Sequence, residues 1–447
     1  MKIKIAILIN DFFFNNYETF YERLKNHSDI FECIVIATEG YSDKNKNFHA
    51  ISEYLTSIEV ENIDYKKGKK LFSLQEYKPD YVFYLVPYDC YFPKEYQSSE
   101  VSKYAKVCHI SYGASMVKNT GLYESLKNNS FYDNASYIFV ETNYQLDFGS
   151  YTKKFVPIGY MKLDKYFFFK DIKKSERKRK RIIWKPRWTL ESDSNFWNEI
   201  ENIYSFIKKH KELDFFIYYH PLFLEKIQEK KEMDKYENIN SELKKLSNYF
   251  ECEYSNFLDI VLDADILISN HSSTLVEFAA TGKPIIYCAS SVLLNDLGNA
   301  IMSNNYTSKK SDETIKILED LLNGKDSKKI IREKNKMSYY FFPEGKESIS
   351  NYLMHYIEKD YFQTKAIKLE FDNTDFKNKQ KELNKKYKKL VNKNKILIEK
   401  ENSLNKENTQ IRKRNDELEE KLNKKNIEIE KIKNSFLYKC KNFLRRR

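Results

Sequence analysis

The sequence is poor in glycine and proline and has no long apolar run. Only 10 glycines and 8 prolines occur among 447 residues. No uninterrupted apolar stretch approaches the ~18 residues that a membrane-spanning helix needs, so we expect no such helix. The apolar segment near the amino terminus is too short for a secretory signal, and no small-residue cleavage site follows it. We therefore predict a cytoplasmic protein.

Cysteines and clustered metal ligands are also scarce. The six cysteines form no Cys-x-x-Cys pair and no metal-ligand spacing, and most lie in or beside strand-like apolar runs. We interpret them as buried, reduced thiols. The one Asp-x-Asp pattern, Asp263 and Asp265, begins a buried strand, which favours capping or sheet-edge roles. We predict no cofactor and no essential metal.

Basic residues exceed acidic ones by 77 to 65, which gives a net charge of +12. This excess permits attraction to phosphate-bearing substrates, nucleic acid or an anionic membrane. The most basic run, 173–181, has no aromatic residues and no RNA-binding motif beside it, so we interpret it as a solvated linker and predict no nucleic-acid partner. Because lysine and tyrosine are abundant throughout, a single residue of either type carries little information.

Short apolar runs alternate with helix-length segments over the first 165 residues. The strand-like runs are 3–9, 31–38, 80–88, 106–113 and 136–142. Strands that are apolar on both faces and separated by helices indicate a parallel sheet covered on both sides. We predict a doubly wound, Rossmann-like α/β domain over residues 1–165.

A second series of the same kind follows, over residues 166–365. Its strand-like runs are 181–188, 214–221, 263–270 and 282–288, and a helix is predicted over 196–210. Two successive doubly wound domains form a cleft between the carboxyl ends of their sheets, where ligands of such folds bind. The fold class is therefore α/β with two such domains, which favours a transferase.

After residue 365 a seven-residue repeat begins. Apolar residues recur at Leu383, Leu390, Leu397, Leu404, Ile411 and Leu418, and the facing positions are mostly polar, including Asn394, Asn408 and Asn415. This pattern predicts a coiled coil over 366–436 and a parallel homodimer, because buried asparagines favour a two-stranded register. A single charged helix or a partly disordered tail is the alternative.

The last residues, 437–447, mix apolar and basic side chains. Such a segment suits an anionic membrane surface, and a frayed basic end is the alternative. We predict peripheral binding at the inner face of the cell membrane.

Small polar residues lie between a buried strand and a helix at 270–274. Ser272 or Ser273 can cap the helix, whose first N–H groups and dipole suit a phosphate. Glu277 lies one turn further on, within reach of a ribose or another hydroxyl-rich group. Taken alone, such serines are usually only a helix cap.

The stretch 267–287, "LISNHSSTLVEFAATGKPIIY", resembles the segment that closes the nucleotide site in the CDP-glycerol glycerophosphotransferase family, which includes the teichoic-acid polymerases. It is also similar to the donor site of many GT-B glycosyltransferases. The segments 156–167, 182–188 and 215–221 resemble further family motifs in the same order. The resemblance covers roughly residues 80–345 and implies a GT-B arrangement of the two domains.

The resemblance implies a donor site in the second domain. Its residues would be Arg187, His220, Asn270, His271, Ser272, Ser273, Thr274 and Glu277. In this site Arg187 would clamp a phosphate, although it precedes Trp188 and so departs from the family order. His220, as an imidazolium, would stabilise developing phosphate charge. The alternative interpretation of His220 is a histidine at the end of a strand that only forms hydrogen bonds with the backbone.

The first domain departs from the family where a "WHG" histidine is expected as the general base. This chain reads "VCHISYG", so Tyr112 and Gly113 stand at that position and His109 comes three residues earlier. The candidate bases are His109, which we favour because histidine titrates near neutrality, and Tyr112, whose phenol is a poor base. The remaining alternative is that no base is present.

We therefore expect a transferase that moves a glycerophosphate or glycosyl group from a CDP-activated donor to a hydroxyl of a surface polysaccharide or lipid-linked glycan. A nucleotide-sugar glycosyltransferase is the alternative within enzymes. A non-catalytic, membrane-recruited scaffold is the alternative of another class, supported by the missing family histidine.

Overall fold

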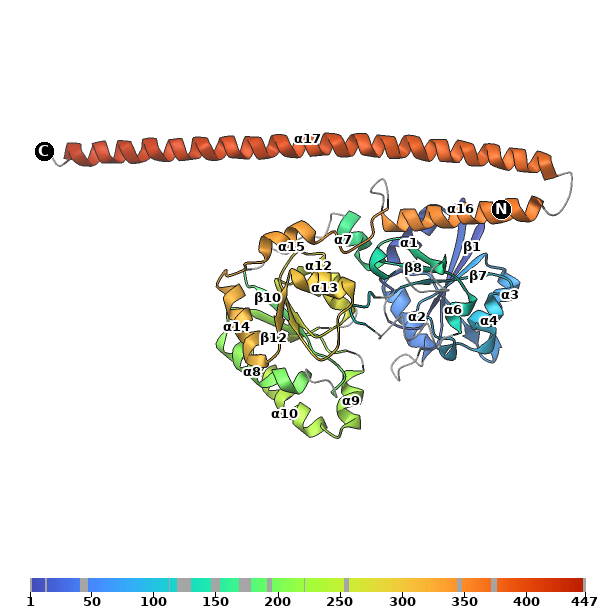
Figure 1. Cartoon of the computed structure of the whole chain (residues 1–447), viewed down its shortest axis with the longest axis horizontal. Coiled ribbons are helices and arrows are strands. Elements are labelled where there is room, and N and C mark those ends of the chain that lie inside the picture. Colours follow the sequence, from blue (N-terminus) through green and yellow to red (C-terminus); the bar gives the residue numbers. More distant parts are fainter. Residues whose placement is uncertain are drawn as a thin grey trace. The chain divides into compact units, whose positions relative to one another are not determined.

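The computed structural model describes most of the chain in two compact units, Met1–Tyr361 and Phe362–Arg447. The described ranges are 2–12, 14–40, 47–111, 113–118, 130–145, 153–168, 178–190, 195–220, 222–252, 257–343, 348–370 and 376–444. The first unit consists of two α/β lobes, each built around its own sheet (Figure 1).

The first lobe contains a seven-stranded, fully parallel sheet in the order β3-β2-β1-β6-β7-β8-β9. Its strands are β1 Ile3–Ile9, β2 Phe31–Ala37, β3 Ile63–Asp64, β6 Tyr81–Tyr84, β7 Lys106–Ile110, β8 Ala135–Val140 and β9 Phe155–Pro157. The helices are α1 Glu18–Asn26, α2 Phe48–Ser57, α3 Leu74–Tyr77, α4 Ser98–Val101 and α6 Phe131–Asn134. A small antiparallel pair, β4 Lys66–Lys67 and β5 Lys70–Leu71, lies outside this sheet.

Burial on both faces explains why these runs form a parallel sheet. Consecutive residues of β1, such as Ile7, Leu8 and Ile9, are all fully buried, so neither face of the strand meets solvent. The chain winds outward from β1 in one direction and then restarts at β6 on the other side. This reversal places a crevice at the carboxyl ends of β1 and β6.

The second lobe has the same design, with six parallel strands in the order β12-β11-β10-β13-β14-β15. The strands are β10 Arg181–Lys185, β11 Asp214–Ile217, β12 Tyr249–Glu251, β13 Ile266–Ser269, β14 Ile285–Cys288 and β15 Tyr306–Ser308. Its helices are α8 Phe196–Lys209, α9 Phe223–Glu229, α10 Met233–Lys244, α11 Phe257–Asp263, α12 Ser273–Ala279, α13 Asp296–Ser303, α14 Ser311–Leu322 and α15 Lys329–Asn335. The prediction of two doubly wound α/β domains is confirmed.

Two segments of the first lobe pack into the core of the second. The loop after β7 contributes Ala114 and Met116, and the crossing segment contributes Tyr160 and Leu163 to that core. The crossing segment contains the short helices η5 Met161–Leu163 and α7 Asp164–Phe168. The loop also pairs with the entry to α13, because the N–H of Asn295 donates to the carbonyl of Met116 (2.9 Å). The lobes are therefore joined beyond the covalent connection.

The helix α16, Ile349–Glu370, returns to the first lobe. The carboxylate of Asp360 accepts hydrogen bonds from the hydroxyls of Tyr81 and Tyr137 (both 2.5 Å) and pairs with Lys106 (2.6 Å). All three partners belong to the first sheet. The sequence-based range 166–365 assigned this helix to the second domain, whereas these contacts are with the first lobe.

The second unit consists mainly of one helix, α17, which runs from Phe376 to Leu444. Five repeat positions are 39% to 56% exposed in the single chain: Leu390, Leu397, Leu404, Ile411 and Leu418. The helix is confirmed, and its pairing into a coiled coil stays a prediction. Side chains beyond residue 425 lie outside the described part. The predicted binding of the tail 437–447 to a membrane therefore stays a prediction. No helix among the described residues is long and apolar enough to cross a membrane.

Candidate active site

A polar pocket of about 200 Å³ lies at the carboxyl edge of the second sheet. It is lined by Lys185, Pro186, Arg187, Trp188, His220, Ser269, Asn270, His271, Ser272 and Ser273. These residues follow the neighbouring strands β10, β11 and β13. The strand order reverses between β10 and β13, so the pocket occupies the position where doubly wound sheets bind ligands.

Lys185, the last residue of β10, is a pocket residue that we did not predict. Its ammonium donates to the hydroxyl of Thr274 (2.7 Å). Burial and the charges of Lys162 and Arg187, which outweigh the opposing charge of Glu277, together lower the pKa of Lys185 to about 8. Lys185 is therefore a cation at neutral pH, held at the start of α12.

Arg187 and Asn270 connect the ends of the central strands. The backbone N–H of Arg187 donates to the side-chain oxygen of Asn270 (3.0 Å), whose amide donates to the carbonyl of Cys288 (3.0 Å). The guanidinium of Arg187 donates to Thr189 (2.9 Å) and to the carbonyl of His271 (3.3 Å). Arg187 thus stands at the pocket as predicted, and Asn270 shapes the pocket through backbone contacts.

The predicted Ser-Ser-Thr segment forms the amino terminus of α12. Ser272 is the cap residue, and its hydroxyl accepts from the N–H of Thr274 (3.2 Å). Ser273 lines the pocket. Thr274 is only 1% exposed, and its hydroxyl accepts the hydrogen bond from Lys185. The cap interpretation of Ser272 is therefore right, and the pocket lies directly beside it.

The expected imidazolium of His220 is wrong for this structure. Burial, together with the charges of Lys185 and Arg187, lowers the pKa of His220 to about 3. Its Nδ1 accepts from the N–H of Leu222 (3.2 Å), so the neutral ring carries its proton on Nε2. The ring stacks on Trp188 with centroids 5.2 Å apart. His220 is therefore a neutral ring that can donate a hydrogen bond from Nε2. Its Nδ1 accepts from the backbone, which agrees in part with the alternative of a structural histidine at the strand end.

Glu277 does not line the pocket. It is 2% exposed, and its Oε1 accepts from the hydroxyl of Tyr160 (2.8 Å) and from the ammonium of Lys162 (3.0 Å). Burial raises the pKa of Glu277, but Lys162, Lys185 and Tyr160 together lower it below its usual value. Glu277 is thus the anion of a buried network that joins the crossing segment to α12, and its predicted contact with a ribose stays a prediction.

His109 is buried, and its expected titration near neutrality is wrong. The ring is 1% exposed, and its Nδ1–H donates to the carbonyl of Tyr84 (2.9 Å). Burial lowers the pKa of His109 to about 4. These contacts are those of a structural histidine between β6 and β7. The second candidate base, Tyr112, lies outside the described residues.

A buried carboxylate that we did not predict, Glu141, lies one residue after β8. It is 3% exposed, and its Oε2 has no hydrogen-bond partner in the described part of the chain. Burial raises its pKa to about 7, while a hydrogen bond from Ser111 and the charge of Lys162 oppose that shift. In the sequence this glutamate looks like an ordinary strand end.

Gly113 brings the first lobe against the pocket of the second lobe. A Cβ at this position would lie 2.7 Å from the Cβ of Ser273 and 3.0 Å from its hydroxyl. Only a residue without a side chain permits this approach. The loop after β7 therefore touches the rim of the pocket.

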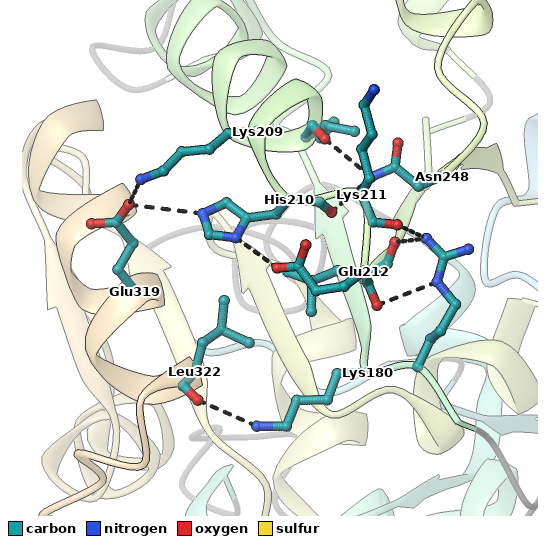
Figure 2. A network of polar contacts seen from close by, with 11 residues as sticks. Lys180, Lys209, His210, Lys211, Glu212, Asn248, Glu319 and Leu322 are labelled. Atoms are coloured by element: carbon teal, nitrogen blue, oxygen red, sulfur yellow. Dashed lines mark hydrogen bonds and ion pairs between the residues drawn. The ribbon is translucent and has the colours of Figure 1, made fainter.

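A larger pocket, of about 560 Å³, lies at the opposite edge of the second sheet, before β10 and β11 begin. Here His210 contacts Glu212 (2.8 Å) and Glu319 (3.9 Å), and Lys209 contacts Glu319 (2.8 Å) (Figure 2). Lys180 donates to the carbonyl of Leu322 (3.5 Å) at the end of α14. Lys209 and His210 pair with carboxylates and Lys180 with the carboxyl end of a helix, so these three cations already have partners within the protein.

No group of three or more potential metal ligands occurs within the described ranges. The side chain of Asp265 accepts from the N–H of Arg181 (2.8 Å), and Asp263 pairs with the guanidinium of the same arginine (2.9 Å). The two aspartates thus hold the start of β10, in agreement with the structural role predicted for them.

No family model matches the sequence, and no curated protein matches it. Several solved structures match the fold. A UDP-GlcNAc 2-epimerase from Neisseria meningitidis bound to UDP-GlcNAc has a TM-score of 0.54 at 15% identity, over 80% of this chain and 100% of that chain. The S. aureus MnaA–UDP co-structure has a TM-score of 0.52 at 14% identity, over 81% of this chain and 97% of that one.

The wall teichoic acid polymerase TagF also matches, with a TM-score of 0.52 at 14% identity, over 81% of this chain and 90% of that chain. At such identities the likeness concerns the fold. Together with the two doubly wound lobes, it shows that the chain has the GT-B fold, as the sequence resemblance implied.

Proposed function

We propose that this chain is a transferase that binds a nucleotide-diphosphate donor at the pocket of the second lobe. The observation that carries the proposal is the position of that pocket at the reversal of strand order, with Lys185 and Arg187 on its wall. Transfer would go to a hydroxyl of a surface polysaccharide or lipid-linked glycan. We propose that the acceptor enters from the first lobe.

The pocket supplies groups that suit a departing nucleotide. Lys185 and Arg187 are cations, and His220 offers an Nε2–H donor. Fixed donors of this kind stabilise the charge that develops on a leaving phosphate without a metal ion. We propose that the reaction needs neither a metal nor another cofactor.

The donor that we propose is CDP-glycerol or a related CDP-alcohol. Its support is the sequence resemblance and the fold likeness to TagF. The alternative is a nucleotide sugar, because two structures of similar fold were solved with UDP-GlcNAc and with UDP. The product distinguishes them, since glycerophosphate transfer creates a phosphodiester and glycosyl transfer does not.

Isothermal titration with CDP-glycerol, UDP-GlcNAc and a GDP-sugar tests donor binding. We expect one of them to bind in the micromolar range, and Ser273→Ala, which leaves the buried network intact, to weaken that binding several-fold. Asn323→Ala, at the larger pocket, is the matched control and should bind like the unchanged chain. If none of the donors binds to the folded protein, the proposed transferase function fails.

We further propose that α17 pairs with a second copy in parallel and that the basic tail binds an anionic membrane face. The exposed leucines of the repeat support the pairing. Deletion of residues 366–447 should therefore give a monomer that still binds nucleotide, as measured by analytical ultracentrifugation and calorimetry. A truncated chain that remains dimeric would show that the globular unit associates by itself.

A further inference from the structure

Glu141 and Ser111 lie side by side at the carboxyl edge of the first sheet. Ser111 follows β7 and Glu141 follows β8, and the N–H of Ser111 donates to the carbonyl of Phe139 (2.9 Å). Gly113, two residues beyond Ser111, contacts Ser273 at the rim of the donor pocket. Glu141 thus occupies the edge of the first lobe that meets the donor site.

The surroundings of Glu141 come from both lobes. Lys162 and Glu277 act on it electrostatically, and Glu141 in turn acts on Tyr160. The carbonyl of Glu141 accepts from the N–H of Phe341 (3.0 Å), which fixes its backbone. Its Oε2 is a buried acceptor without a hydrogen-bond partner among the described residues. A hydroxyl entering between the lobes would supply the missing donor.

The two carboxylates of this cluster differ in their proton affinity. Lys162, Lys185 and Tyr160 outweigh burial at Glu277 and lower its pKa, whereas burial raises the pKa of Glu141 to about 7. Such a separation is typical of sites in which one carboxylate stays charged and the other exchanges a proton. A pKa close to the working pH is also what efficient general-base catalysis requires.

We propose that Glu141 is the proton acceptor for the incoming hydroxyl, the role for which the sequence favoured His109. The proposal rests on the proposed transferase function and deepens it. Glu141 takes the place of a buried histidine in which burial disfavours proton uptake and whose Nδ1–H donates to a backbone carbonyl.

In the proposed step the hydroxyl oxygen attacks the phosphorus that bears glycerol, or the anomeric carbon of a sugar. Its proton passes to Glu141 as the new bond to oxygen forms. The bond from the transferred group to the nucleotide phosphate breaks, and its electron pair leaves with the nucleotide. Lys185 and Arg187 stabilise that charge. Water can replace the acceptor hydroxyl, which gives slow donor hydrolysis.

A buried glutamate can also be purely structural, and the second lobe offers an example with similar burial. Glu199 on α8 is likewise 3% exposed, its Oε2 also lacks a hydrogen-bond partner among described residues, and burial raises its pKa. It lies against Ser311 and Thr314 of α14, away from the pocket. Glu199→Gln therefore controls for the loss of a buried carboxylate as such.

The experiment measures nucleotide release from CDP-glycerol and from UDP-GlcNAc, with water as the acceptor, between pH 5 and 9. We expect kcat to rise with pH through an apparent pKa near 7 and then level off. Glu141→Gln should lower kcat by about 100-fold or more and abolish the pH dependence, with the Kd for the donor unchanged. Formate should restore part of the activity to Glu141→Ala. Glu199→Gln should keep both kcat and its profile.

Retention of kcat and of its pH profile by folded Glu141→Gln would overturn the assignment of the base. Donor binding by the unchanged chain without nucleotide release at any pH would also overturn it and would favour the scaffold alternative. Absence of donor binding would instead refute the proposed function on which the assignment rests.

Discussion

Replacement of Lys185 by methionine should weaken binding of a nucleoside diphosphate by about 10- to 100-fold. The reason is the loss of a charged donor from a partly buried pocket, which costs about 1.5 to 3 kcal/mol of binding free energy. Methionine preserves the apolar stem of the side chain. Calorimetry with CDP and UDP measures the effect, and circular dichroism checks that the variant is folded.

The same lysine predicts a pH dependence of affinity. Burial lowers the pKa of Lys185 to about 8, so the ammonium is present below that pH and is lost above it. A bound phosphate favours the charged form, so affinity should fall as the pH rises from 8 to 10. Lys185→Arg keeps its charge over this range and should lose the dependence. Equal affinity in Lys185→Met and the unchanged chain would show that the phosphate binds elsewhere.

Glu277→Gln should destabilise the first unit by about 3 kcal/mol or more. Removing one partner of a buried ion pair is costly because the remaining charge loses its nearest counter-charge, and here the side chain of Lys162 is only 17% exposed. Thermal and urea unfolding at pH 7 measure the loss. The control is Glu61→Gln, because Glu61 pairs with Lys25 at 2.8 Å on the surface, where such pairs contribute little.

The sign of the pH effect follows from the lowered pKa of Glu277. Its charged form stabilises the folded state, so the contribution is fully present above its usual pKa of 4.5 and is lost as the pH falls through the lower, folded-state value. The difference in stability between the unchanged chain and Glu277→Gln should therefore be constant near neutrality and shrink in acid. A difference that grows in acid would contradict an ion-paired Glu277.

The central strands could be predicted from the sequence because their burial on both faces leaves a continuous apolar run. The ranges 3–9 and 31–38 match β1 and β2 almost residue for residue. The short strands at the sheet edges were missed, among them β12 and β15, because three residues with partial exposure carry no periodicity. The return of α16 to the first lobe depends on tertiary contacts of Asp360, which no local pattern encodes.

At the pocket, the sequence identified the loop that forms one wall and missed the groups around it. Ser272 and Ser273 were recognisable because a cap has a local signature. Lys185 was discounted because lysine is common throughout this chain. His109 and Glu141 differ in ways that only the folded structure reveals. The Nδ1–H of His109 donates to a carbonyl, whereas Oε2 of Glu141 has no hydrogen-bond partner among the described residues. Charge on a buried group depends on neighbours that are distant in sequence.

The partnership of α16 with the first sheet has a consequence for biosynthesis. The hydroxyl of Tyr81 meets Asp360 across a separation of 279 residues. As the chain leaves the ribosome, β6 is therefore complete long before its covering helix exists. The part of the first sheet that α16 contacts therefore lacks this helix while the whole second lobe is translated. Closure of such a long loop is slow and leaves apolar surface open to association, so the newly made chain is most vulnerable just before α16 emerges.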